Sequence, residues 1–343
     1  MVGIDDVARR AGVSTATVSR ALSGRGHVAT ATRERVEEAA AELGYVVSAS
    51  ASSLATGRMR NIGVVVPFLN RWFYTSVLEG AQRRLMQYGY DLTLYNLSGS
   101  SNERSTVFET FLLRQRVDAV IAVSLELSAE EVDSLHALGK PLVGVGGPIR
   151  GVPTVSIDDV GVTRLATEHL LSLGHTVIGH IGGDVDAEMS FHMPTNRRLG
   201  WEDALRDAGV EPRPELYSPA VFTMESGYVA AKQMLGDPRL RPTAVVVASD
   251  EMAIGVILAA RDMGLDVPRD LSVVGIDDHE LAPFFGLTTV AQFPEQQGER
   301  AVELLMRELD QSRDDEPANL QLPFELIVRS STSRPRPERE QRG

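Results

Sequence analysis

Residues 4 to 22 read IDDVARRAGVSTATVSRAL and predict two short helices joined by a tight turn. The first helix has one apolar face, formed by Ile4, Val7, Ala8 and Ala11. The second has an inward face formed by Val13, Val18 and Leu22. Gly12 ends the first helix, and Ser14 can cap the second. Because Ala8 and Gly12 are small, the helices can cross closely, as a helix-turn-helix requires.

A third helix is predicted from residue 30 to residue 43. Thr30 stands at its N-cap, Gly44 ends it, and Tyr45 follows. Its inward positions are Val36, Ala39, Ala40 and Leu43. Three helices can close a small core, so residues 1–46 are predicted to form one domain. An outward face of its second helix carries groups that can meet base edges, at Thr15, Ala16, Ser19 and Arg20.

The chain combines a basic head with an acidic body. Its net charge is −13. Residues 1–35 hold six arginines against three acidic residues, a net charge of +3, which leaves −16 for the remainder. Because phosphate contacts dominate the affinity for DNA, this asymmetry favours a protein whose head alone approaches nucleic acid.

Composition indicates a globular protein of more than one domain. The 343 residues suit a small module plus one or two mid-sized domains. Hydrophobic residues make up 43% and charged residues 24%, with neither a signal peptide nor an apolar run of membrane-spanning length. The absence of cysteine excludes disulfides and thiolate chemistry. We therefore expect a cytoplasmic protein without a membrane partner.

From residue 60 onward, short apolar runs alternate with amphipathic stretches. The strand candidates are residues 62–66, 92–95, 119–123, 142–145, 155–157, 177–181, 244–248 and 273–276. The helix candidates are residues 76–88, 103–114, 160–173, 198–207, 251–263 and 296–309. This alternation predicts α/β architecture, and the length favours two parallel sheets with a cleft between them. Residues 335–343 are expected to form a disordered tail.

Ligands of parallel sheets bind beyond the carboxyl ends of the strands, so the residues after each strand form a candidate site. They are residues 68–74, 146–147, 190–197, 222, 249–250 and 277–278. The aromatic rings among them, Trp72, Phe73, Tyr74 and Phe222, can pack against the C–H groups of a ligand. The charged groups, Arg197, Asp250 and Asp277, can hold neighbouring hydroxyls. A small polar ligand is predicted, and carbohydrate fits best.

Several of these residues also allow a structural interpretation. Asp277 and Asp278 could cap a turn, Phe222 could belong to the core, and Arg197 could pair with a carboxylate. Trp201 is expected to pack beneath a helix. The three histidines at positions 169, 175 and 180 lack a convergent third or fourth partner for a metal ion. We therefore predict neither a metal site nor a cofactor.

The stretch from 4 to 22 resembles the amino terminus of the lac repressor/galactose repressor (LacI/GalR) family of bacterial transcriptional regulators. The match continues through residues 32–36 and 43–45, and it returns in the body at 166–175, 241–244, 249–255, 267–278 and 287–290. The resemblance implies a DNA-binding domain over 1–46, a hinge over 47–59, and a two-lobed, periplasmic-binding-protein-like sensor and dimerisation domain over 60–334. Its first lobe would hold about 60–159 and 290–318, and its second about 160–289 and 319–334.

The resemblance also implies which residues contact DNA. Thr15, Ala16 and Arg20 match base-reading positions, and Arg20 suits bidentate contact with guanine. The candidates for phosphate contact are Ser14, Thr17, Ser19 and Tyr45. By composition the serine-rich hinge is typical of a flexible linker. In the family it forms a short helix on the operator, which makes Ala51 and Leu54 candidate contacts, with Leu54 as a wedge between base steps.

An effector site follows from the same resemblance. The matching positions are Phe73, Tyr74, Arg197, Phe222, Asp250 and Asp277. The purine-responsive relative has arginine and threonine where Phe191 and Met193 stand here, which argues against a purine. The resemblance implies a homodimer on a palindromic operator, released by a mono- or oligosaccharide.

Two other classes of protein share parts of this pattern. An α/β enzyme would be expected to show a nucleophile elbow, a phosphate loop or a dinucleotide-binding glycine motif, and none is present. No catalytic residue is therefore predicted, and an assay for turnover of the ligand would decide. An extracytoplasmic sugar-binding protein would share the two-lobed body but would lack the DNA-reading head.

Overall fold

The computed structural model describes residues 2–23, 27–45, 58–97, 104, 106–107, 116–125, 127–137, 139–183, 193–310 and 319–336. The hinge contacts Ala51 and Leu54, most of the helix predicted over 103–114, and the tail beyond residue 336 lie outside these residues. The chain divides into two compact units, Met1–Asn61 with Gln115–Asp118, and Ile62–Arg114 with Ala119–Gly343.

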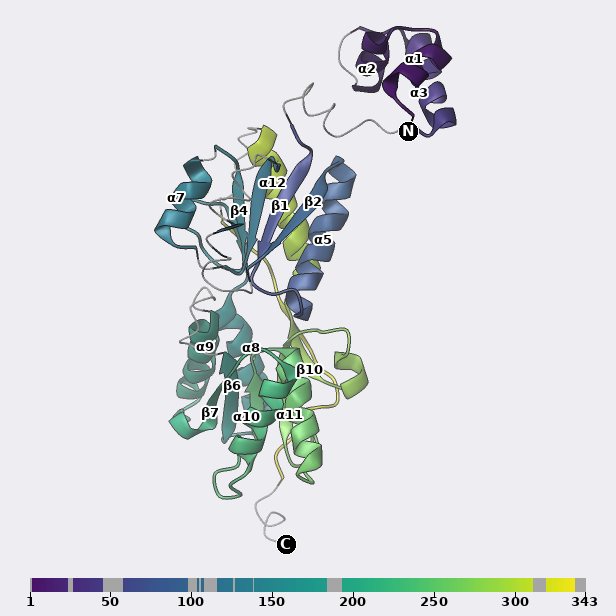
Figure 1. The fold of residues 1–343 in the computed structure, drawn as a ribbon. Helices are drawn as coiled ribbons and strands as arrows, with labels where there is room; N and C mark the ends of the chain where they lie inside the picture. The colour runs from purple at the N-terminus through teal and green to yellow at the C-terminus, as the bar shows by residue number, and fades with distance from the viewer. Residues whose placement is uncertain are drawn as a thin grey trace. The chain divides into compact units, whose positions relative to one another are not determined.

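In its described residues, the first unit contains three short helices, labelled in Figure 1. They are α1 (Ile4–Ala11), α2 (Thr15–Ser23) and α3 (Thr30–Leu43). Gly12 ends α1 with φ of 68°, and the Ser14 hydroxyl accepts a hydrogen bond from the Thr17 N–H at 3.2 Å, as an N-cap does. Val7, Val18 and Val36 are fully buried at the centre of the core.

One predicted cap of this unit is wrong. The N-cap of α3 is Ala29, which has no side-chain group to cap the helix, and Thr30 is the first helical residue. The far end follows the prediction, because Gly44 takes φ of 63°.

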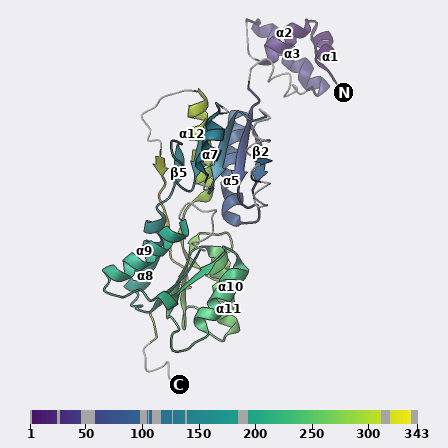
Figure 2. The same cartoon turned by 60° about the vertical axis from the view of Figure 1, so that its left-hand side comes forward.

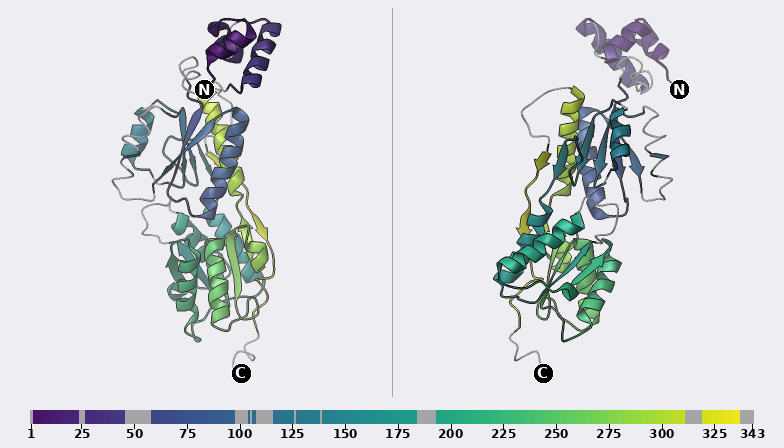
Figure 3. Two further views of the ribbon diagram at one scale, coloured as in Figure 1. Left: turned by 45° about the vertical axis from the view of Figure 1, so that its right-hand side comes forward. Right: turned by 90° about the vertical axis from the view of Figure 1, so that its left-hand side faces the viewer.

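In the second unit, the first lobe is built on a six-stranded sheet. In sheet order the strands are β11 (Asn319–Gln321), β5 (Thr154–Ser156), β4 (Leu142–Val145), β3 (Ala119–Val123), β1 (Asn61–Val66) and β2 (Asp91–Asn96). The pairings from β11 through β1 are parallel. Helices α5 (Trp72–Tyr88) and α12 (Pro294–Asp310) pack side by side against it (Figure 3), and α7 (Ala129–Ala137) also belongs to this lobe.

Glycines permit the close approach of α5 and α12. A Cβ on Gly80 would lie 2.0 Å from the carbonyl oxygen of Glu295, and one on Gly298 would lie 2.1 Å from the carbonyl oxygen of Val77. Any side chain at these two positions would push the helices apart, so their spacing is set by the sequence. This contact places the start of α12 beside α5.

The second lobe repeats the plan with a second six-stranded sheet. Its order is β12 (Glu325–Ile327), β10 (Thr288–Ala291), β9 (Ser272–Asp277), β8 (Ala244–Val247), β6 (Ile178–Gly183) and β7 (Tyr217–Ala220). Only the β10–β12 pairing is antiparallel. Figure 2 shows α8 (Asp159–Ser172) and α9 (Met193–Asp207) on one face, and α10 (Met224–Leu235) and α11 (Asp250–Asp262) on the other.

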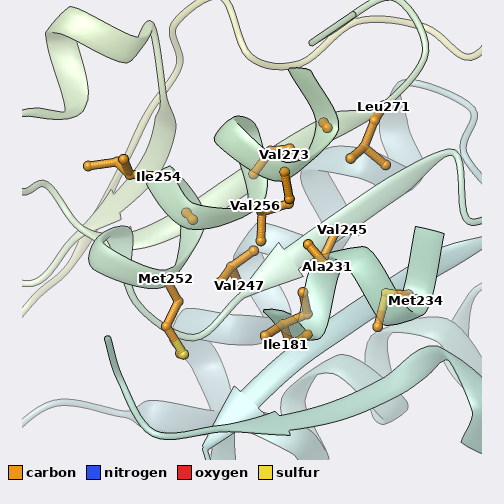
Figure 4. Close-up of a cluster of buried hydrophobic side chains, with 14 of the residues drawn as sticks. Ile181, Ala231, Met234, Val245, Val247, Met252, Ile254, Val256, Leu271 and Val273 are labelled. Carbon is orange, nitrogen blue, oxygen red and sulfur yellow. The ribbon is translucent and has the colours of Figure 1, made fainter. Parts of the chain in front are cut away.

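The second lobe has a core on each face of its sheet, one beneath α8 and α9 and one beneath α10 and α11. Val245, Val247 and Val273 from the strands meet Met252 and Val256 of α11 (Figure 4). Because the sheet is covered on both faces, its strands are apolar along their whole length rather than alternating. This rigid layer carries the strand ends at which the candidate site lies.

The expected lobe limits lie at about 290 and 319, and the sheet pairings show which strands the chain places in each lobe. Strand β10 lies entirely in the second sheet, so the chain leaves the second lobe after Ala291. Strand β11 pairs with β5 in the first sheet, so the chain returns to the second lobe after Gln321. Two helices also begin earlier than predicted, α5 at Trp72 and α9 at Met193.

None of the helices in the described part of the chain is long and apolar enough to cross a membrane.

Candidate functional site

A cavity of about 230 Å³ is lined by residues of both lobes. The first lobe contributes Phe68, Arg71, Phe73, Tyr74 and Ser124. The second contributes Pro194, Arg197, Phe222, Glu251 and Asp277. Five of the six expected effector contacts therefore line one cavity. The sixth, Asp250, does not line it.

The first-lobe wall is aromatic because α5 begins directly after the loop that follows β1. Its first turn brings Phe73 and Tyr74 together, with ring centroids 5.5 Å apart and ring planes at 85°. Phe68 meets Tyr74 edge-on at 6.0 Å, and the Arg71 guanidinium lies 5.3 Å from the centre of the Phe68 ring. Burial raises the pKa of Tyr74 to about 12, although a hydrogen bond with Ser124 opposes this shift. Tyr74 is therefore a neutral hydroxyl in an apolar wall.

Arg197 supplies the positive charge of the second-lobe wall. Its Nε donates to Asp159 Oδ1 at 2.9 Å, and its Nη1 donates to the carbonyl oxygen of Ala248, at the end of β8. Both charged side chains are buried. Burial raises the pKa of Asp159, while the Arg197 guanidinium opposes that effect. Arg197 thus has the carboxylate partner considered from the sequence, and it also lines the cavity.

Asp277 supplies a carboxylate at the end of β9. Its backbone has φ of 131°, which side-chain-bearing residues rarely adopt. Oδ1 accepts a hydrogen bond from Gln292 Nε2, and Oδ2 accepts one from the Asp250 N–H at 3.4 Å. Burial raises the pKa of Asp277 to about 7, and Arg197 and the Gln292 hydrogen bond act in the opposite direction. Asp277 therefore lines the cavity with a carboxyl group whose pKa is about 7.

Asp250 lies behind this carboxylate and supports it. It is fully buried, Oδ1 accepts from the Thr289 hydroxyl at 2.7 Å, and Oδ2 accepts from the His279 N–H at 2.9 Å. Burial and the nearby Asp277 charge both raise the pKa of Asp250. A Cβ on Gly275 would lie 1.9 Å from Asp250 Oδ1, so the glycine makes room for it. Asp250 holds the turn after β9 in place.

The neighbouring turn residue, Asp278, points to a different partner. Its Oδ1 accepts from Arg329 Nη2 at 2.6 Å, and Arg329 Nη1 also donates to the carbonyl oxygen of Leu287 at 2.8 Å. Asp278 therefore pairs with an arginine of the C-terminal segment, which differs from the turn cap considered from the sequence. The pair ties the C-terminal segment to the turn that presents Asp277.

Several lining residues escaped the sequence analysis. Ser124, Asp159 and Gln292 each lie just after a strand, so the strand-end rule could have found them. The last of these follows β10, which was not predicted. Glu251 and Gln297 lie on helices, and no local pattern distinguishes them.

The expected DNA-facing residues gather on α2. Ser14, Thr15, Ala16, Ser19 and Arg20 are exposed, whereas Thr17 is half-buried. Arg20 Nε donates to the carbonyl oxygen of Ala16 at 3.1 Å, which holds the arginine along the helix. Tyr45 is half-buried and packs against the three-helix core. Exposed polar groups on a helix of this size can enter the major groove of DNA.

The histidines take structural positions. His175 lies within 3.1 Å of the hydroxyls of Thr243 and Ser272 and of the Ser333 carbonyl oxygen. His180 is buried and stacks on Trp201, with ring centroids 5.7 Å apart. Within the described ranges, no three His, Asp or Glu side chains are arranged to hold a metal ion.

A three-helix head with a polar recognition face, joined to a two-lobed body around a cavity, defines a helix-turn-helix protein with a ligand-sensor domain. Residues 3–48 match the family model for bacterial regulatory proteins of the lacI family. Residues 167–332 match the model for a periplasmic binding protein-like domain. The chain belongs to the LacI family of bacterial transcriptional regulators.

Individual relatives match over nearly their whole length. The HTH-type transcriptional regulator RegA of Clostridium saccharobutylicum is 35% identical over 96% of this chain and 98% of its own. A lac repressor dimer bound to operator and the anti-inducer ONPF has a TM-score of 0.83 at 30% identity, covering 97% of this chain and 99% of that one. A CelR–cellobiose complex has a TM-score of 0.71 at 32% identity, covering 96% and 100%.

Proposed function

We propose that this regulator binds a palindromic operator as a homodimer and is released from it by a small sugar held between its lobes. The observation that carries the proposal is the composition of the cavity. Aromatic faces from the first lobe oppose Arg197 and Asp277 from the second. A ligand with hydroxyls on its edge and C–H groups on its faces satisfies both walls at once.

The DNA-binding head and the ligand-binding body have complementary roles in this proposal. The α2 face formed by Thr15, Ala16 and Arg20 reads bases, while Ser14, Thr17, Ser19 and Tyr45 contact phosphates. Ala51 and Leu54 contact the minor groove. The lac repressor relative was solved as a dimer on its operator, and the CelR relative was solved with cellobiose. Because it acts on chromosomal DNA, we place this chain in the cytoplasm.

Dimerisation is supported by the surface of the second lobe. Phe284 is 84% exposed and Val229 is 48% exposed. We propose these two exposed side chains as contacts with a second copy of the chain. A two-fold dimer presents one head to each half of a palindromic site.

The position of the cavity supports control of DNA binding by the ligand, and we propose that the ligand releases the protein from DNA. A sugar that contacts both lobes favours one lobe arrangement over others, and it changes DNA affinity in proportion to that preference. We propose that the sugar is bound and not converted. Incubation of the sugar with the protein, followed by chromatography, tests this point, and a product formed at a catalytic rate would contradict it.

The full proposal is tested in two stages. Random double-stranded DNA enriched on the full chain should yield a palindromic consensus. A thermal-shift screen of mono- and disaccharides should then raise the melting temperature of wild type but not of Arg197→Leu, because a ligand that prefers the native state stabilises it. A shift retained in full by Arg197→Leu would place the ligand elsewhere.

A further inference from the structure

Two buried glutamines connect the first lobe to the Asp277 carboxylate. Gln297 is 1% exposed and Gln292 is 3% exposed. Gln297 Nε2 donates to the backbone carbonyl oxygen of Gln292 at 2.8 Å and also lies 3.4 Å from its side-chain oxygen. Gln292 Nε2 donates in turn to Asp277 Oδ1. The two amides form a continuous relay that ends on the carboxylate.

The relay passes from one lobe to the other. Gln297 lies near the start of α12, the helix that packs on the first-lobe core beside α5. Gln292 lies on the crossover between β10 and α12. Asp277 ends β9 of the second lobe. A change in the angle between α12 and the second sheet would therefore alter the hydrogen bond at Asp277.

Asp277 depends on neighbouring groups for its direction. Its φ of 131° and the φ of 60° at Asp278 place two side-chain-bearing residues in the unfavourable left-handed half of conformational space. Such a turn persists only when its surroundings hold it. Two donors act on the carboxylate, the Asp250 N–H on Oδ2 and Gln292 Nε2 on Oδ1.

We propose that Gln297 is a positioning residue of the effector site: it orients the Gln292 amide, and through that amide it fixes the Asp277 carboxylate for the ligand. The inference rests on the proposed function for its biological meaning. The hydrogen bonds on which it is based join protein groups only. Gln297 acts through Gln292, so its replacement changes Asp277 without any direct contact between the two side chains.

The charges around Asp277 define a readout. Arg197 and the Gln292 hydrogen bond favour the ionised carboxylate, whereas burial and Glu251 disfavour it, and Asp250 lies beside it as a second acid. If Gln297 releases Gln292, the donor on Oδ1 weakens and the carboxylate holds its proton to higher pH. Loss of one such hydrogen bond corresponds to an upward shift of about 0.5 to 1 pH unit.

The experiment is a pH titration of the full chain, without ligand, by NMR of aspartate labelled with carbon-13 at the carboxyl group. The signal of Asp277 is assigned by its loss in Asp277→Asn. Gln297→Met keeps the volume and removes the amide. Gln296→Met is the matched control, because Gln296 is the exposed neighbour on the same helix.

We expect Gln297→Met to raise the midpoint of the Asp277 signal by about 0.5 to 1 unit and Gln296→Met to leave it in place. In a Gln292→Met background, Gln297→Met should add no further shift. An unchanged midpoint in Gln297→Met, or an equal shift in the Gln292→Met background, would overturn the relay. Should Gln297→Met fail to fold, Gln297→Asn, whose shorter amide cannot span the same distance, is measured in its place.

Failure of the relay and failure of the proposed function are distinguishable. The titration needs no sugar, so a confirmed shift in a protein that binds no sugar would contradict only the effector assignment. A protein that responds to a sugar but shows no shift would contradict only the role of Gln297.

Discussion

The ring of Trp72 lies 4.9 Å from the ring of His279, centroid to centroid, and joins the first lobe to the second. Trp72 directly precedes the aromatic wall of the cavity, and His279 follows Asp277 by two residues. Glu251, at the start of α11, also accepts a hydrogen bond from the Trp72 backbone. A movement of the lobes must therefore change the environment of both halves of the cavity.

The ring contact should appear as a coupling energy. In a double-mutant cycle of Trp72→Ala and His279→Ala, urea unfolding at pH 8 should give a coupling of about 0.5 to 1.5 kcal/mol. The control cycle pairs His279→Ala with Tyr88→Ala, at the far end of α5, and should be additive. Additivity in the Trp72 cycle would show that the two rings do not stabilise this arrangement of the lobes.

Asp277→Asn should make the stability of the protein less dependent on pH while it weakens sugar binding. Because burial raises the pKa of Asp277 to about 7, the native state keeps a proton that the unfolded chain releases near pH 4. The free energy of unfolding therefore falls as pH rises through this window. The asparagine has no proton to lose, so between pH 4 and pH 8 the stability of the variant should rise relative to wild type by about 2 to 4 kcal/mol. Denaturant unfolding of both proteins across this range measures it, and a stability difference between them that stays constant with pH would contradict it.

His180 should contribute the opposite pH dependence. Burial lowers the pKa of His180 to about 4. Below about pH 6.5 the unfolded chain therefore binds a proton at this histidine, whereas the native state does not. Stability that depends on His180 is present above pH 6.5 and is lost as pH falls toward 4, by about 3 kcal/mol at most. Melting curves of His180→Leu should show a flatter pH profile than wild type, whereas His136→Leu, at an exposed site on α7, should follow wild type. Parallel profiles for His180→Leu and wild type would refute the assignment.

Arg20→Ala should relax sequence preference at one base pair in each half-site. Loss of a bidentate guanine contact costs about 1 to 3 kcal/mol of discrimination. Arg35→Ala, an exposed arginine on α3, removes the same charge and should weaken all sequences alike. Binding measured against operators substituted one position at a time distinguishes the two results. Equal losses on every operator for Arg20→Ala would assign it to phosphate instead.

The sequence was most informative where local rules dominate. Gly12 and Gly44 end their helices with positive φ as predicted, and the wholly apolar runs such as residues 119–123 form central strands. The helix α10 was missed because MESGYVAAKQML has a glycine on its buried face, and its stability comes from packing on α11. Short strands such as β11 are set by their partner in the sheet rather than by their own three residues.

The candidate site was likewise predicted only where local rules apply. Strand-end position placed Asp277 and Phe222 at the cavity, but it also selected Asp250, which lies one layer behind. The difference depends on Thr289, which is remote in sequence and donates to Asp250 from strand β10. The position of Gln297 could not be predicted from local sequence. Its proposed role depends on a hydrogen bond to Gln292, which precedes the start of α12. Such relations emerge only when the strands and crossovers are in place.

The central claim is that a ligand between the lobes controls DNA binding. Fluorescence anisotropy of the enriched palindromic operator, titrated with the full chain in the presence and absence of the sugar found by thermal shift, tests it most directly. We predict that the sugar lowers the operator affinity of wild type by about tenfold or more, which lies within the usual range of coupling energies. The operator affinity of Arg197→Leu should not change. An operator affinity that the sugar leaves unchanged in wild type would contradict the account.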